Sequence, residues 1–131
     1  MLLTETAPAC QPNTQSFLDK DHGLLIGGAW VPAASIASFE VHIPADGQVS
    51  SRAAEGDRED VDRAVAAARR AFESGAWPKL TPSERGKLLW NLADLLEAHL
   101  DEFAELESLD IGKPKAVAAA ADVPLAVDLF R

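Results

Sequence analysis

The sequence is poor in the residues that most catalytic and metal chemistry uses. Its 131 residues include a single cysteine, Cys10, so no disulfide can form within the chain. Cys10 stands close to two prolines, without a neighbouring cation to favour its thiolate, and we expect an incidental thiol. The histidines, His22, His42 and His99, lack the spacing of metal ligands, and no CxxC, HExxH or GxSxG motif is present. The residues alone therefore predict no catalytic residue and no cofactor-binding residue.

Long apolar runs and basic clusters are missing as well. No stretch approaches the roughly 20 apolar residues that span a bilayer, and Met1–Cys10 lacks the basic start of a secretory signal. With 12 Lys and Arg against 21 Asp and Glu, the net charge is −9, and the only basic doublet is Arg69-Arg70. A nucleic-acid binder needs clustered Lys and Arg to displace counterions from phosphates. We therefore expect a cytoplasmic protein that binds neither nucleic acid nor a membrane.

What the sequence does have is a short β-rich segment after a polar start. Residues 1–22 are mixed and polar, and we expect a mobile arm with one helical turn near Ser16–Asp19. The apolar runs on either side of Gly27-Gly28 predict a tight hairpin, since glycine tolerates the positive φ of its turn. Phe39–Ile43 alternates apolar and polar residues as a strand does, and Val49–Ala54 is expected to return beside it.

Helical signals follow the strands. From Asp57, a good N-cap, apolar residues recur at helical spacing until Gly75 ends the run. Thr81-Pro82-Ser83-Glu84 is a capping box, and the leucine-rich stretch after it is long for one helix. We therefore expect a break near His99–Asp101, with Asp101 or a neighbour capping the second helix.

The end of the chain is predicted to be helical again. Gly112 and Pro114 stop the leucine-rich run, and Pro124 is expected to kink the last helix because it lacks an amide hydrogen. Helical spacing places four residues near one face of this helix: Ala118, Ala121, Leu125 and Leu129. The predicted fold class is α+β, with a short β-hairpin or meander followed by three or four helices over residues 23–131.

These blocks occur in the order found in aldehyde dehydrogenases. Gly23–Val31 resembles the opening hairpin of that family, Phe39–Gly47 resembles its next strand and turn, and Asp60–Phe72 resembles its first helix. Leu106–Pro114 is the most distinctive block, and Asp122-Val123-Pro124 continues it. The resemblance extends from Gly23 to the end of the chain.

The resemblance implies a larger fold and a chemistry. In the complete family, these elements pack on an α/β dinucleotide-binding domain, and aldehydes are oxidised to acids through a cysteine thiolate with NAD or NADP as hydride acceptor. The catalytic cysteine, the general-base glutamate and the oxyanion-hole asparagine lie beyond the matching region. We therefore expect residues 23–131 to be an incomplete, truncated N-terminal segment that is inactive alone and binds no cofactor. The arm around Ser16–Gly23 resembles phenylacetaldehyde dehydrogenases in particular.

Four positions carry supporting roles by resemblance. His42, through its carbonyl, and Asp110 match positions that hold a monovalent cation in relatives. Ala121 and Leu125 match positions that border the aldehyde channel, where a small Ala121 leaves room for a bulky aldehyde. Ordinary packing is the alternative for all four, since a channel needs a second wall. The sequence departs from the family at Ile43, where relatives usually carry an asparagine.

Three interpretations stay open at this point. The chain is a truncated aldehyde dehydrogenase, a non-catalytic partner that associates through the faces of Val61–Phe72 and Leu88–Leu106, or a free-standing helical domain with its own small-molecule pocket. The first two predict uncovered apolar faces, because the helices lack the sheet on which they pack in relatives. We therefore expect self-association or pairing with the missing remainder of the fold.

Overall fold

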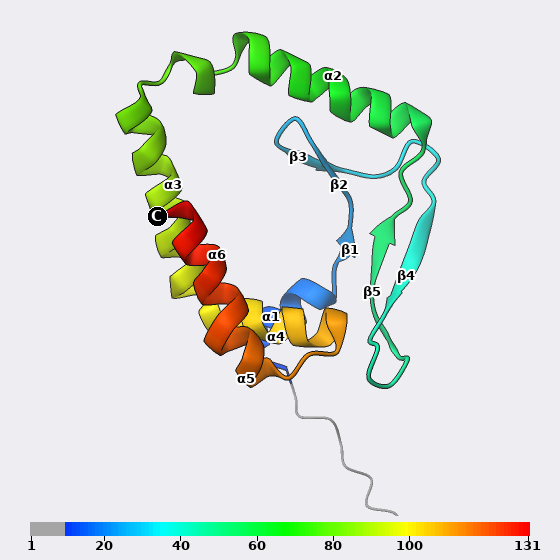
Figure 1. The fold of residues 1–131 in the computed structure, drawn as a ribbon. Coiled ribbons are helices and arrows are strands. Elements are labelled where there is room, and N and C mark those ends of the chain that lie inside the picture. The colour runs from blue at the N-terminus through cyan, green and yellow to red at the C-terminus, as the bar shows by residue number, and fades with distance from the viewer. Residues whose placement is uncertain (1–9) are drawn as a thin grey trace, which may run out of the picture.

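The computed structural model describes residues 10–131, which form an open ring (Figure 1). The helices and strands are α1 (Pro12–Leu18), β1 (Asp21–His22), β2 (Leu24–Ile26), β3 (Ala29–Val31), β4 (Ser38–His42), β5 (Val49–Ala54), α2 (Arg58–Ser74), α3 (Pro82–Ala98), α4 (Leu100–Ile111), α5 (Lys115–Val117) and α6 (Val123–Phe130). A 3-10 turn, Trp77–Lys79, joins α2 to α3, and a π-helical segment, Ala118–Asp122, joins α5 to α6. The strands occupy one side of the ring and α3 and α6 the other, so the predicted α+β class is confirmed.

The predicted mobile arm, residues 1–22, falls partly on residues 1–9, which lie outside the described residues. From Pro12 the chain forms the seven-residue helix α1, which is longer than the single turn expected, and Thr14 is buried. β1 then pairs in parallel with Arg52 and Ala53 of β5. This part of the arm is therefore packed on the rest of the chain, through partners distant in sequence that a local pattern does not reveal.

The strands form two small sheets. β2 and β3 make the predicted hairpin, and Gly27 and Gly28 have φ values of 62° and 83°, as its turn requires. β4 and β5 pair antiparallel, as expected, with a register shift between Val41 and His42. The second sheet has the order β1-β5-β4, so β5 is its central strand.

Two capping boxes begin the long helices. The Asp57 carboxylate accepts the backbone N–H of Glu59 at 2.8 Å and starts α2 as predicted. At α3, the Glu84 N–H donates to Thr81 Oγ1 at 3.3 Å, and the Thr81 N–H donates to Glu84 Oε2 at 2.7 Å. The hydrogen bonds from the Thr81 backbone and side chain lower the pKa of Glu84. The predicted capping box is therefore confirmed.

The leucine-rich stretch breaks where predicted, but its second helix is capped differently. α3 ends at Ala98 and α4 begins at Leu100, with His99 between them at φ −107°. Of the two expected caps, Asp101 or a neighbour, the neighbour His99 stands at the N-cap position, without a side-chain capping bond to the backbone. Asp101 lies inside the first turn, where its negative charge suits the helix dipole. α4 ends at Gly112 in the left-handed region, as predicted.

The last helical stretch contains a π segment rather than a simple kink at Pro124. Ala118–Asp122 is π-helical, and this wider turn precedes the proline that cannot donate a hydrogen bond. The wider turn shifts the helical phase, so the predicted common face is wrong. Val123 and Val127 are buried with Ala118, whereas Leu125 and Leu129 are 66% and 81% exposed.

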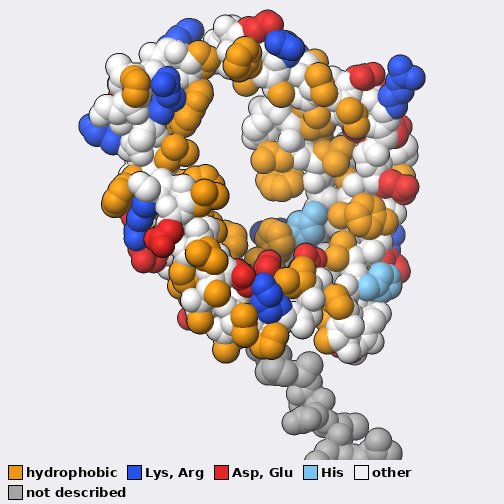
Figure 2. All heavy atoms as spheres, viewed as in Figure 1, with side chains coloured by type: hydrophobic (Ala, Val, Ile, Leu, Met, Phe, Trp, Pro, Cys, Tyr) orange, Lys and Arg blue, Asp and Glu red, His pale blue; other side chains and the backbone are white. Residues whose placement is uncertain are grey.

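The buried core is small and built from small side chains. The buried apolar residues of the described region are Ala33, Ala93, Ala104, Ala118, Val123 and Val127. Larger apolar side chains are left uncovered, including Phe72, which is 74% exposed. Figure 2 shows hydrophobic side chains gathered along the inner rim of the ring. Soluble monomers rarely leave so much apolar surface uncovered. Within residues 10–131, no helix has both the length and the apolar character that crossing a membrane requires.

Candidate functional site

The two predicted channel residues lie on the π segment and the helix after it. Ala121 is partly buried in the π segment, and Leu125 is exposed on α6. The π segment packs against α4, and an ion pair of 2.5 Å between Lys113 Nζ and Asp122 Oδ2 ties it to the loop after α4. These contacts fix the backbone that carries Ala121 and Leu125. Their role in the channel stays a prediction.

The two predicted cation positions lie on segments that meet. His42 is at the end of β4, with its ring Nδ1 3.1 Å from the Gly47 carbonyl oxygen. Asp110 is exposed near the end of α4. A Cβ atom on Gly112 would lie 3.5 Å from Pro44 Cβ, so the chain just after His42 touches the chain just after Asp110. Across residues 10–131, no three His, Cys, Asp or Glu side chains are arranged so that they could hold a metal ion together. A cation held partly by carbonyls at these positions stays a prediction.

The Asp60 carboxylate is buried and accepts several hydrogen bonds, whereas the sequence singled out only Asp57 as the cap of α2. The Asp60 side chain is 2% exposed and accepts hydrogen bonds from the backbone N–H of Ala34, at 3.1 and 3.2 Å, and of Asp57, at 3.2 Å. Arg63 Nη1 pairs with it at 3.0 Å. The carboxylate therefore joins the loop after β3 to the start of α2. The acidic residue three positions after the N-cap was the available signal.

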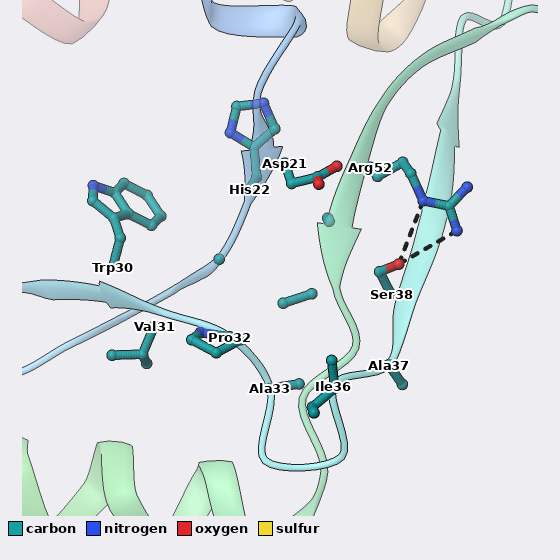
Figure 3. A pocket seen from close by; sticks show the side chains of 13 residues that line it. Asp21, His22, Trp30, Val31, Pro32, Ala33, Ile36, Ala37, Ser38 and Arg52 are labelled. Carbon is teal, nitrogen blue, oxygen red and sulfur yellow. Dashed lines mark hydrogen bonds between the residues drawn. The ribbon is translucent and has the colours of Figure 1, made fainter.

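A hollow of about 370 Å³ lies between β1, the hairpin and β5 (Figure 3). His22 and Trp30 lie on one side of it, and the Asp21 carboxylate is directed toward the side of Arg52. Arg52 is engaged elsewhere, with Nη1 2.9 Å from Glu40 Oε1 and hydrogen bonds to Ser38. The hollow is therefore lined by aromatic and small apolar side chains, and its arginine is already bound by Glu40 and Ser38.

The N-terminus of α2 bears on whether these residues can hold a dinucleotide. A pyrophosphate is usually bound where a strand leads through a glycine turn into a helix, and β5 leads through Gly56 into α2 in this way. Here the Asp57 carboxylate already accepts the first-turn amides of Glu59 and Asp60, and the Asp60 carboxylate accepts the amide of Asp57. Two carboxylates at this end would repel a pyrophosphate. The start of α2 therefore does not fit the pyrophosphate of NAD or NADP.

Comparisons with known proteins agree with the fold. The model of the aldehyde dehydrogenase family matches residues 30–131. The chain is 50% identical over 108 residues to the mitochondrial benzaldehyde dehydrogenase of Antirrhinum majus, covering 82% of this chain and 20% of that protein. It is 43% identical over 117 residues to the putative aldehyde dehydrogenase DhaS of Bacillus subtilis (strain 168), covering 89% of this chain and 24% of that one.

Solved structures give the same result. An NAD+ complex of aldehyde dehydrogenase from Bacillus cereus superposes with a TM-score of 0.91 at 41% identity, covering 94% of this chain and 25% of that one. Betaine aldehyde dehydrogenase from Staphylococcus aureus, in complex with NAD+, superposes with a TM-score of 0.83 at 35% identity, covering 90% and 24%. The chain belongs to the aldehyde dehydrogenase family. It spans about a fifth to a quarter of the length of these relatives.

Proposed function

We propose that the chain forms the N-terminal wall of an NAD-dependent aldehyde dehydrogenase, which oxidises an aldehyde to its acid, and that it has no such activity alone. One observation carries the proposal: the backbone matches an NAD+-bound relative with a TM-score of 0.91, yet the large apolar side chains of the ring are uncovered. In this proposal, NAD, the nucleophile and the general base belong to the rest of the fold. This chain positions the helices that border the substrate.

A chimaera tests this proposal. In the Bacillus cereus enzyme, the corresponding quarter is replaced by this chain, and NADH formation from phenylacetaldehyde is followed by absorbance. We expect the chimaera to oxidise the aldehyde and the chain alone to form no NADH. A chimaera that folds and binds NAD+ but is inactive would contradict the proposal, as would turnover by the chain alone.

The proposed partner follows from the uncovered faces. Val61, Val65 and Phe72 on α2 are 58%, 62% and 74% exposed, so this helix presents an apolar face with nothing over it. We infer that the face pairs with the rest of an aldehyde dehydrogenase fold, and that isolated copies associate with one another. The same face supports the second candidate function, a non-catalytic partner of another chain. Such a partner would bind a complete relative without changing the products formed.

Aromatic aldehydes in the cytoplasm are the proposed substrates. A relative named for benzaldehyde is 50% identical, and by the family resemblance a small side chain at Ala121 would leave room in the channel for a bulky aldehyde. A single cysteine without a disulfide suits the reducing cytoplasm.

The size of residue 121 is expected to set the aldehyde range of the chimaera. Ala121→Met adds three heavy atoms to the proposed channel wall and should raise KM for phenylacetaldehyde by roughly tenfold or more. KM for acetaldehyde should change little, because the small substrate leaves space unused. Ala120→Met is the matched control, since Ala120 is exposed and is not assigned to the channel. Equal effects of both substitutions on both aldehydes would remove Ala121 from the channel.

A further inference from the structure

The short helix α1 has few interactions of its own that would stabilise it. It has seven residues, and isolated helices of that length are unstable in water. Gln11 stands at its N-cap without a side-chain capping bond, and its first turn carries no acidic residue. Some distant part of the chain must therefore supply the interactions that keep α1 helical and docked.

Glu105 of α4 supplies the missing cap. The backbone N–H of Gln11 donates to Glu105 Oε2 at 3.0 Å, across a sequence separation of 94 residues. The other carboxylate oxygen lies 3.4 Å from Lys115 Nζ of α5. Thr14 is 1% exposed; its buried hydroxyl lacks a hydrogen bond of strict geometry, yet it lies close enough to Glu105 to lower the pKa of that carboxyl. A negative charge at the start of α1 also meets the positive end of its dipole.

The other end of α1 is held in a different way. The Phe17 ring lies against the His22 ring, with their centroids 4.4 Å apart. His22 belongs to β1, which is paired with β5, so this end is fixed to the sheet. Figure 1 shows α1 lying beside α4. One end of the helix is therefore joined to a sheet, whereas the other is held by the packing of Thr14 and by the Glu105 carboxylate.

Beneath α1 is an apolar cavity. It has a volume of about 420 Å³ and lies between α1, α3 and α4. Thr14 and Phe17 of α1 face apolar side chains of the two longer helices, including Leu96, Phe103 and Leu106. The position of α1 therefore decides how far this cavity is open.

We propose that α1 is a hinged strap over this cavity, latched at its N-terminal end by the Glu105 carboxylate and fixed at its other end by β1. The proposal does not depend on aldehyde oxidation, because it concerns contacts within the described chain.

The charged groups around Glu105 determine the pH range in which the latch is formed. Lys115 is the cation that faces Glu105, while Lys113 is paired with Asp122, and Asp19, which follows α1, is bound by Gln15. On the cavity side, His99, which precedes α4, pairs with Glu102. Burial raises the pKa of Glu105, but the nearby Thr14 hydroxyl and the hydrogen bonds from Gln11 and Lys115 outweigh it and leave the pKa below its ordinary value of 4.5. The stabilisation that the ionised Glu105 gives the latch is therefore fully present above the ordinary pKa of 4.5. It is lost as the pH falls through the lower pKa of the folded state, so the latch holds at neutral pH.

Hydrogen exchange at neutral pH tests the latch. The backbone amides of Gln15 and Asp19 each donate within α1 at 2.9 Å, and their exchange reports its opening. Glu105→Gln removes the charge from the latch and should speed exchange of these amides by roughly tenfold to a hundredfold. Exchange in the middle of α3 should not change. Glu107→Gln on the same helix is the control and should leave α1 unaffected.

A second variant keeps the result interpretable if Glu105→Gln disturbs α4. Gln11→Pro removes the donor and keeps the backbone angle, since Gln11 already has a φ of −58° that suits proline. It should speed exchange of the α1 amides as Glu105→Gln does, and the two changes together should add little to either alone. Unchanged α1 exchange in both variants, or fully additive effects, would overturn the latch.

Discussion

Asp60→Ala is expected to loosen the junction between the β3–β4 loop and α2 by about 3 kcal/mol, because it removes several hydrogen bonds to one buried charge. The Ala34 N–H and the Arg63 guanidinium lose their acceptor, and the Asp57 N–H loses its capping partner. The same loop contains Ile36, whose φ of 60° is strained for a β-branched residue and persists only while its surroundings hold it. Amide exchange at Ala34 should rise by roughly a hundredfold.

Asp62→Ala is the matched control for this change. Asp62 is exposed one position beyond Val61 on the same helix, so its loss should alter exchange by no more than a few tenths of a kcal/mol. If Asp60→Ala and Asp62→Ala change amide exchange at Ala34 equally, Asp60 does not hold the β3–β4 loop to α2. Loss of all protected amides in Asp60→Ala, with protection kept in Asp62→Ala, would still support the structural role of Asp60.

The second large effect is expected on association. Light scattering of the isolated chain should show a mass that rises with concentration, because the apolar face of α2 is uncovered. Val65→Glu places a charge in the middle of that face, next to residues that are more than half exposed. We expect the concentration at which association begins to rise by roughly tenfold or more, since a buried unpaired charge opposes the contact.

The control must carry the same change in net charge. Gln48→Glu adds one negative charge in the turn between β4 and β5, away from the face of α2. If both variants weaken association to the same extent, general repulsion in a chain of net charge −9 explains the result. In that case the face of α2 would lose its assigned role.

Local signals in the sequence predict the elements well, and non-local contacts account for what they miss. The Gly27-Gly28 turn, the capping box at Thr81 and the stop at Gly112 depend on a few adjacent residues, and all three are confirmed. The docking of α1 depends on Glu105, 94 residues away, and β1 depends on β5. Neither contact leaves a pattern within its own segment.

The misassigned face of the last helix has a different cause. An even helical spacing was assumed across Ala118–Asp122, but a π segment there changes the phase of every later residue. Leu125 and Leu129 consequently lie at the surface, and Val123 and Val127 are buried. For the candidate site, the family resemblance predicted the positions of Ala121 and Leu125, whereas their support by the Lys113–Asp122 ion pair required three-dimensional contacts.

The most direct test of the central claim is a calorimetric titration of NAD+ into the purified chain, with light scattering on the same sample. The account predicts no saturable binding together with concentration-dependent association, because the amides at the start of α2 are bound by carboxylates and the ring is uncovered. Saturable NAD+ binding by a stable monomer would show that the chain builds a nucleotide site of its own, and would contradict the account.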